Sequence, residues 1–200
     1  RNVIGERSRP NDRRIGRWMA QRGGVILDIG SGPGGGYMPF ILQADPAARI
    51  IVSDLSHTVV EEWKQFLDAE HDSPYLCYAA LDFCDIPFKS GTVDVIGDHS
   101  GILNCIGDQS AALRECYRVL KPGGVLVSMS GFVTRNDLTA LPESARQELL
   151  EKYPSMAIDL YEDTVLAGFR KIDSEVTGTW TTEEGGSGLA DLARSLGVTV

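Results

Sequence analysis

A carboxylate and a run of glycines stand next to each other near the start of the chain. Asp28 lies within the apolar stretch 25–29, and five glycines follow in the seven positions 30–36. Glycine lets the main chain adopt dihedral angles that are closed to other residues and come close to a ligand. The helix expected next directs its unpaired amide groups at the same place. The pattern predicts a buried strand that runs into a nucleotide-binding turn.

The charge of Asp28 separates two kinds of ligand. Gly30, Gly32 and Gly35 fit the dinucleotide pattern G-x-G-x-x-G. Asp54 lies about where a ribose-binding acid belongs, so an NAD site is one alternative. A phosphate gains nothing from a carboxylate two residues before the first glycine, because like charges repel. A cationic ligand gains a charge-assisted partner there, so Asp28 favours a cation.

Three further acids come soon after predicted strands. The strands cover residues 49–53, 75–80 and 92–97, and the acids that follow them are Asp54, Asp82 and Asp98. In a parallel sheet with right-handed crossovers, the ends of such strands open on one edge. His99 follows Asp98, and the imidazole of histidine is a side chain that suits a general base near neutral pH. The alternative is that His99 only positions a cofactor or forms a hydrogen bond within its loop.

Three segments resemble the class I S-adenosylmethionine-dependent methyltransferases. The stretch from Asp28 to Gly34 is similar to their first motif, (D/E)-x-G-x-G-x-G. The stretch from Asp82 to Phe88 is similar to their D-x-x-x-(L/I)-P-F segment, and that from Arg118 to Gly124 to their R-x-L-K-P-G-G segment. The cofactor of that family carries an ammonium and a sulfonium but no phosphate, which agrees with the position of Asp28.

The resemblance implies a site for S-adenosylmethionine, with S-adenosylhomocysteine as the product and no metal. Asp54 is placed to accept hydrogen bonds from two ribose hydroxyls, unless it only caps the next helix. Asp82 is expected to accept from the adenine amino group, while the Phe83 amide reaches a ring nitrogen. Asp98 and His99 are expected beside the methionine part of the cofactor and the methyl acceptor. The complete predicted set is Asp28, Gly30, Ser31, Gly32, Gly34, Asp54, Leu55, Asp82, Phe83, Asp98 and His99.

Hydrophobic periodicity predicts an α/β fold with a doubly wound, mostly parallel sheet and helices on both faces. Strands are expected at 25–29, 49–53, 75–80, 92–97, 125–129 and 172–182, and helices at 11–21, 37–44, 57–70, 108–120, 142–153, 159–167 and 189–196. Lys64 is expected on the inward stripe of the third helix. Class I methyltransferases usually close their sheet with antiparallel strands. The strand that begins at 198–200 is therefore expected to be incomplete, as in a truncated chain.

The 200 residues are expected to form a single methyltransferase domain. Its predicted parts are a helical cover over 1–24, a cofactor-binding core over 25–130, an acceptor-site cover over 131–170, and closing strands with a helix over 171–200. The first part is rich in arginine, which is typical of a targeting segment, an arm for an anionic substrate or a solvated helix face. The helical spacing of Ile15, Trp18 and Met19 favours the solvated face.

Composition and charge exclude several classes of protein. The net charge of −9 argues against a general nucleic-acid binder. No apolar run approaches the roughly 20 residues that span a bilayer, so no membrane segment is expected. The four cysteines show no C-x-x-C pairing and the three histidines are scattered. We therefore expect reduced thiols, a cytoplasmic setting and no structural zinc.

The predicted function is the transfer of a methyl group from S-adenosylmethionine to a small-molecule acceptor by direct in-line displacement. The fourth predicted strand is followed by Asp98-His99-Ser100-Gly101 rather than (N/D/S)-P-P-(Y/F). This difference disfavours the enzymes that methylate DNA bases or glutamine. Two alternatives stay open: an NAD-dependent oxidoreductase, and a methyltransferase-like domain that binds the cofactor or nothing and serves as a partner or regulatory subunit.

Overall fold

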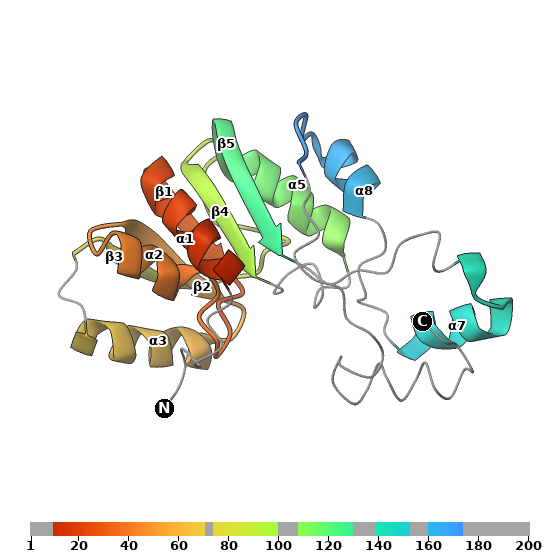
Figure 1. Cartoon of the computed structure of the whole chain (residues 1–200), viewed down its shortest axis with the longest axis horizontal. Coiled ribbons are helices and arrows are strands. Elements are labelled where there is room, and N and C mark those ends of the chain that lie inside the picture. The colour runs from red at the N-terminus through yellow and green to blue at the C-terminus, as the bar shows by residue number, and fades with distance from the viewer. Residues whose placement is uncertain (1–9, 71–73, 100–107, 130–138, 153–159, 174–200) are drawn as a thin grey trace.

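A parallel five-stranded sheet forms the centre of the computed structural model, which describes residues 10–70, 74–99, 108–129, 139–152 and 160–173. The strands are β1 (Val25–Ile29), β2 (Arg49–Asp54), β3 (Leu76–Ala80), β4 (Val93–His99) and β5 (Leu120–Met129). They lie in the order β3-β2-β1-β4-β5, and every neighbouring pair is parallel (Figure 1). This order confirms the predicted doubly wound sheet, whose winding direction reverses between β1 and β4.

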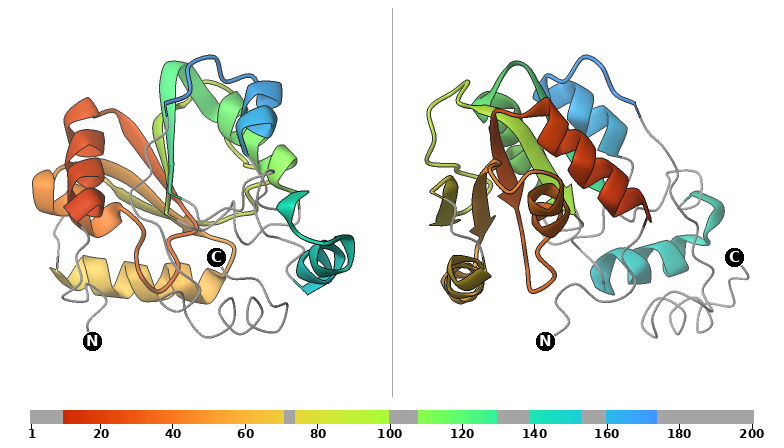
Figure 2. Two further views of the ribbon diagram at one scale, coloured as in Figure 1. Left: turned by 45° about the vertical axis from the view of Figure 1, so that its right-hand side comes forward. Right: turned by 60° about the vertical axis from the view of Figure 1, so that its left-hand side comes forward.

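Helices cover both faces of the sheet, as predicted (Figure 2). One face carries α1 (Pro10–Arg22), α2 (Met38–Ala44) and α3 (His57–Glu70), and the other carries α5 (Gln109–Val119) and α8 (Leu160–Ala167). The helix α7 (Glu143–Lys152) lies apart from the sheet (Figure 1). In β1, Ile26 packs in the first layer and Leu27 in the second. Burial on both faces explains why this strand is almost continuously apolar.

The helix α1 packs closely on α2. A Cβ added at Gly16 would lie 2.4 Å from the Cβ of Phe40, so only glycine permits this approach. The buried side of α1 consists of Asp12, Gly16, Met19 and Ala20. The arginines of α1 are exposed, which confirms the predicted solvated face. Trp18 is also 41% exposed and lies beneath the Arg22 guanidinium.

Two strand boundaries differ from the prediction. The strand β4 continues to His99, because Asp98 and His99 pair with Ser128 and Met129 of β5. The strand β5 begins at Leu120, so the L-K-P-G-G segment belongs to this strand instead of ending the helix before it. An irregularity in the pairing between Val93 and Val95 accommodates these residues. Proline is tolerated in a strand at such irregular positions.

Some predicted elements lie elsewhere or outside the described residues. Lys64 is exposed and pairs with Asp68, so the prediction that it faces inward is wrong. Within the predicted acceptor-site cover, α8 packs along α5, and the Tyr117 and Phe169 rings lie 5.3 Å apart. The predicted closing elements after residue 173 lie outside the described residues. Among the helices of the described ranges, none has both the length and the apolar character needed to cross a membrane.

Candidate functional site

The glycine loop between β1 and α2 is folded tightly against its neighbours. Gly30 and Gly32 have φ angles of 61° and 52°, which other residues rarely adopt. The Ser31 amide donates to the Ser53 carbonyl at 3.0 Å, and the Gly35 amide donates to the Ser31 carbonyl at 2.8 Å. The Gly32 carbonyl accepts from the Trp63 indole at 2.7 Å. These bonds fix the loop against β2 and α3.

Gly34 and Gly35 differ in what the fold requires of them. Gly35 has a φ of 75°, and a Cβ there would lie 2.7 Å from the Trp63 ring. Gly34 has no such φ, and a Cβ there would meet no atom within 4 Å. The packing of the loop therefore explains Gly35 but not Gly34. Gly34 faces open space, as expected where a ligand approaches the main chain.

Asp28 lies beneath this loop and is fully buried. One carboxylate oxygen accepts from the Ser31 hydroxyl at 2.6 Å, and the other accepts from the Tyr37 amide at 3.3 Å. Burial raises the pKa of Asp28 to about 7, and the charge of Asp98 adds to this effect. Asp28 and Ser31 thus organise the loop from inside.

Asp54 connects the glycine loop to the start of α3. Its carboxylate accepts from the Gly32 amide and from the Ser56 amide, both at 2.9 Å. The bond to Ser56 corresponds to the capping role considered from the sequence. A carboxylate offers about four acceptor positions, so these two bonds leave capacity for ribose hydroxyls. Leu55 is 70% exposed at the same corner and offers an apolar surface.

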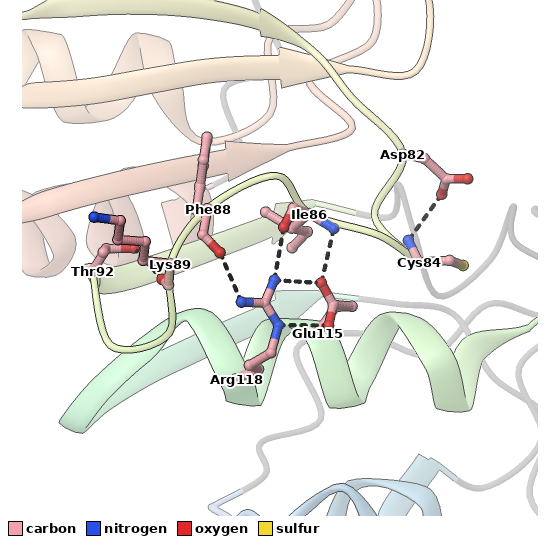
Figure 3. Close-up of polar contacts among 8 residues, drawn as sticks. All are labelled: Asp82, Cys84, Ile86, Phe88, Lys89, Thr92, Glu115 and Arg118. Carbon is pink, nitrogen blue, oxygen red and sulfur yellow. Dashed lines mark hydrogen bonds and ion pairs between the residues drawn. The ribbon is translucent and has the colours of Figure 1, made fainter.

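The loop after β3 carries Asp82 and is joined to α5 by a hydrogen-bonded fork (Figure 3). The Arg118 guanidinium donates to the carbonyls of Ile86 and Phe88, each at 2.7 Å. It also pairs with Glu115, whose carboxylate accepts from the Ile86 amide at 2.8 Å. These contacts give the arginine of the R-x-L-K-P-G-G segment a clear role, which is to hold the loop that presents Asp82.

Asp82 itself is exposed, and one of its oxygens accepts from the Cys84 amide at 2.8 Å. The second oxygen points away from Cys84 (Figure 3). The neighbouring Phe83 side chain is buried in the core beneath α5. Burial of Phe83 fixes the loop so that the Asp82 carboxylate stays at the surface.

The end of β4 brings Asp98 and His99 to the same edge of the sheet as the glycine loop. Asp98 is buried and accepts from the Ser128 hydroxyl at 2.8 Å. The His99 Nε2 lies 3.4 Å from a carboxylate oxygen of Asp12 in α1. The His99 ring also meets the Tyr37 ring edge-on, with centroids 5.1 Å apart. The strand register places Asp98 beside Ile29, one residue before the glycines.

Asp12 and Tyr37 both contact His99, and the sequence analysis did not single them out as candidate site residues. Both are buried, and the structure leaves Asp12 Oδ1 and the Tyr37 hydroxyl without a hydrogen-bond partner among the described residues. The helical spacing contained a signal for Asp12, because it lies three and seven residues before Ile15 and Met19 on the inward side of α1. Tyr37 carried no comparable signal.

The charge of this region fits a cationic group. Burial raises the pKa of Tyr37, and the charges of three buried carboxylates, Asp12, Asp98 and Asp28, add to this effect. The His99 ring contacts one of them, Asp12. A phosphate would be repelled here, whereas an ammonium or sulfonium would be stabilised. This group of buried carboxylates therefore fits S-adenosylmethionine better than NAD.

The described cysteines and acids give no sign of a metal centre. Cys77, Cys84 and Cys116 are free thiols. Within the described part of the chain, no group of three or more His, Cys, Asp or Glu side chains is arranged to hold a metal ion.

Comparison with known proteins identifies the family. The model of the methyltransferase domain matches residues 27–128, just over half of the chain. The ubiquinone/menaquinone biosynthesis C-methyltransferase UbiE of Cereibacter sphaeroides is 34% identical over 137 residues, which cover 68% of this chain and 51% of the relative. The chain thus spans about half the length of the curated relatives it matches.

Solved structures share the fold at lower sequence identity. Geranyl diphosphate C-methyltransferase from Streptomyces coelicolor superposes with a TM-score of 0.62 at 18% identity, covering 82% of this chain and 61% of that chain. The [4+2]-cyclase SpnF superposes with a TM-score of 0.65 at 20% identity, covering 92% of this chain and 65% of that chain. The matched domain, the order of the motifs and the sheet topology agree, and the chain belongs to the class I S-adenosylmethionine-dependent methyltransferases.

Proposed function

We propose that the protein transfers a methyl group from S-adenosylmethionine to a small-molecule acceptor by in-line displacement and releases S-adenosylhomocysteine. The observation that carries the proposal is the set of carboxylates around the glycine loop. Asp28, Asp54 and Asp98 lie at the carboxyl ends of adjacent parallel strands. This edge is where open α/β sheets bind ligands.

Each part of the cofactor has a proposed partner in this set. Asp54 takes the ribose hydroxyls, with Leu55 packed beside them. The exposed carboxylate of Asp82 takes the adenine amino group, and the Phe83 amide takes a ring nitrogen. The loop at Gly30, Ser31, Gly32 and Gly34 approaches the sulfur-containing part, next to Asp98 and His99.

The bound cofactor supplies an activated methyl group, so the residues of the chain have limited chemistry to perform. They align the acceptor with the methyl carbon and exclude water. Where the acceptor must lose a proton, His99 is the proposed general base, since it is the titratable side chain nearest the end of β4 that keeps some exposure, 21%.

The acceptor is proposed to be a small organic molecule. The net charge of −9 disfavours a polyanionic substrate such as DNA or RNA. The names of the similar proteins support a small molecule, since UbiE acts in ubiquinone and menaquinone biosynthesis and the Streptomyces enzyme acts on geranyl diphosphate. The free thiols agree with the proposed cytoplasmic setting.

A calorimetric titration with S-adenosylmethionine, S-adenosylhomocysteine and NAD tests the cofactor. We expect micromolar binding of the first two and none of NAD. Binding of NAD alone would overturn the proposal. If none of the three ligands binds, the result would favour the remaining alternative, a methyltransferase-like domain that serves as a partner or regulatory subunit.

Exchange of His99 for Asn tests the proposed base. The affinity for S-adenosylhomocysteine should stay within about threefold, while turnover of an acceptor found by screening quinols, phenols and amines should fall roughly 100-fold. Turnover equal to that of the wild type would assign His99 to positioning alone.

A further inference from the structure

A buried polar cluster lies between α1 and the ends of β1 and β4. It consists of Asp12, Asp28, Tyr37, Asp98 and His99 and is called the anionic cluster below. Asp12, Asp28 and Asp98 are only 5%, 0% and 1% exposed. Burying a carboxylate is unfavourable unless hydrogen bonds or opposite charges replace its hydration. The partners of each member therefore show what this cluster is built to accept.

Two of the three carboxylates have partners close to their own strands. Asp28 accepts from the Ser31 hydroxyl and the Tyr37 amide, and Asp98 accepts from the Ser128 hydroxyl. Asp12 is different. Its Oδ2 lies 3.4 Å from the His99 Nε2, and its Oδ1 is buried with no hydrogen-bond partner among the described residues. The Oδ1 of Asp12 is thus a strong hydrogen-bond acceptor whose burial is unfavourable unless a donor binds to it.

The Tyr37 hydroxyl provides a second, independent observation. Tyr37 is fully buried, and its hydroxyl also lacks a partner in the described part of the chain. The charges of all three carboxylates act on this hydroxyl, and with burial they raise the pKa of Tyr37, so the phenol keeps its proton. The ring lies edge-on to His99. The cluster thus holds an unpaired carboxylate oxygen and an unpaired hydroxyl, and both oxygens can accept from a cationic group.

The position of Asp12 is fixed by the packing of α1. Gly16 lies one turn after Asp12 on the same face, and it seats the helix directly on Phe40 of α2. Because α1 cannot withdraw from α2 without losing this contact, Asp12 stays at the edge of the sheet where the glycine loop lies. The covering helix therefore brings a carboxylate of its own to the proposed cofactor site.

We propose that Asp12 and Tyr37 recognise the amino-acid end of the cofactor. The Asp12 carboxylate and the Tyr37 hydroxyl oxygen both accept from the ammonium group. This inference rests on the proposed function, because it needs that cofactor. It makes α1 part of the binding site and not only its cover.

Two adenosine ligands test the inference without any methyl acceptor. S-adenosylhomocysteine carries the amino-acid end, whereas 5′-methylthioadenosine keeps the adenosine and the sulfur but lacks that end. The variant Asp12→Asn should bind S-adenosylhomocysteine roughly 10- to 100-fold more weakly, since a charge-assisted hydrogen bond is lost. Its affinity for 5′-methylthioadenosine should equal that of the wild type in calorimetric titrations.

A matched control removes a carboxylate elsewhere. Asp68 on α3 is exposed and pairs with Lys64, so Asp68→Asn should leave both affinities unchanged. A second variant, Tyr37→Phe, keeps the ring against His99 and removes only the hydroxyl. It should weaken binding of S-adenosylhomocysteine roughly 3- to 10-fold and leave 5′-methylthioadenosine unaffected. Thermal unfolding without ligand verifies that each variant is folded.

The outcomes separate this inference from the proposed function. If the wild type binds S-adenosylhomocysteine and both variants bind it equally well, the inference is overturned while the proposed function stands. The same holds if the variants lose affinity for both ligands to the same extent, because the loss then does not concern the amino-acid end. A wild type that binds neither ligand overturns the proposed function and the inference together.

Discussion

The two loops that present acids to the proposed cofactor are stabilised by opposite electrostatics. Beneath the glycine loop, Asp28 is fully buried, and desolvation raises its pKa to about 7. Beneath the loop after β3, the carboxylate of Glu115 is held by Arg118, and these hydrogen bonds lower the pKa of Glu115. One loop thus contains an acid that favours its neutral form, and the other contains an acid that favours its charged form.

This difference indicates a division of roles. A paired carboxylate such as Glu115 stabilises the fold whether or not a ligand is present. A buried carboxylate without a cationic partner, such as Asp28, is costly in the free protein and is relieved when a cation arrives. The loop after β3 is therefore a scaffold for Asp82, while the glycine loop is prepared for a cationic ligand. Four predictions test this comparison.

The largest effect is expected from the titration of Asp28. Its pKa is near the usual 3.8 in the unfolded chain and about 7 in the folded protein. Between these values the folded state binds more protons, so the contribution of Asp28 to stability is fully present below pH 4 and is lost as the pH rises to about 7. The stability lost over this pH range is on the order of 4 kcal/mol.

Comparison with the variant Asp28→Asn isolates this contribution. Urea unfolding of both proteins at several pH values should show the variant gaining stability relative to the wild type between pH 4 and 7. If the difference in free energy of unfolding between the variant and the wild type does not change with pH, Asp28 is ionised throughout this range. The two loops would then not differ in the way described.

The next largest effect concerns the fork at Arg118. Replacing Arg118 by Ala removes the donors of the Ile86 and Phe88 carbonyls and leaves Glu115 without its partner. The free energy of unfolding should fall by about 3 kcal/mol in denaturant titrations. The control Arg114→Ala removes an exposed arginine from the same helix. It should change the free energy of unfolding by less than about 0.5 kcal/mol. Equal effects of the two changes would contradict a scaffolding role for the fork.

Two neighbouring glycines separate folding from ligand binding in the glycine loop. Gly35→Ala should lower the free energy of unfolding by about 2 kcal/mol, because of its φ of 75° and the contact with the Trp63 ring. Gly34→Ala should leave the stability within about 0.5 kcal/mol, since its Cβ meets open space. The Gly34 variant should instead weaken binding of S-adenosylhomocysteine. Unchanged binding would remove Gly34 from the proposed site.

The smallest effect is expected at the surface pair of Lys64 and Asp68. Both side chains are about half exposed, so solvent screens their attraction. Lys64→Ala should leave the midpoint of urea unfolding within experimental error of the wild-type value. A loss as large as that at Arg118 would mean that exposure does not determine the strength of these pairs.

The parallel core could be predicted because its signals are local. The apolar strands, the glycines and the acids after the strands are each visible within a few residues, and they gave the sheet and the positions of Asp28 and Asp54. The ends of β4 and β5 were predicted wrongly because they depend on mutual pairing, which lies outside any single segment. Lys64 was predicted inward because it borders the buried stripe of α3, but its long side chain reaches solvent.

The proposed roles of Asp12 and Tyr37 lay beyond the sequence for a different reason. Their significance arises from three elements that meet in space, namely α1, the start of α2 and the end of β4. A charged residue on a helix is usually solvated. Only the docking of α1 through Gly16 converts Asp12 into a buried acceptor.

The indole of Trp63 gives the protein a built-in optical reporter. Its Nε1 donates directly to the Gly32 carbonyl, and its ring packs against Gly35, while Trp18 lies in the solvated part of α1. Any ligand that shifts the glycine loop must change the surroundings of a buried fluorophore. Tryptophan emission of the unmodified protein should therefore follow occupancy of the loop in real time, without a label and without knowledge of the methyl acceptor.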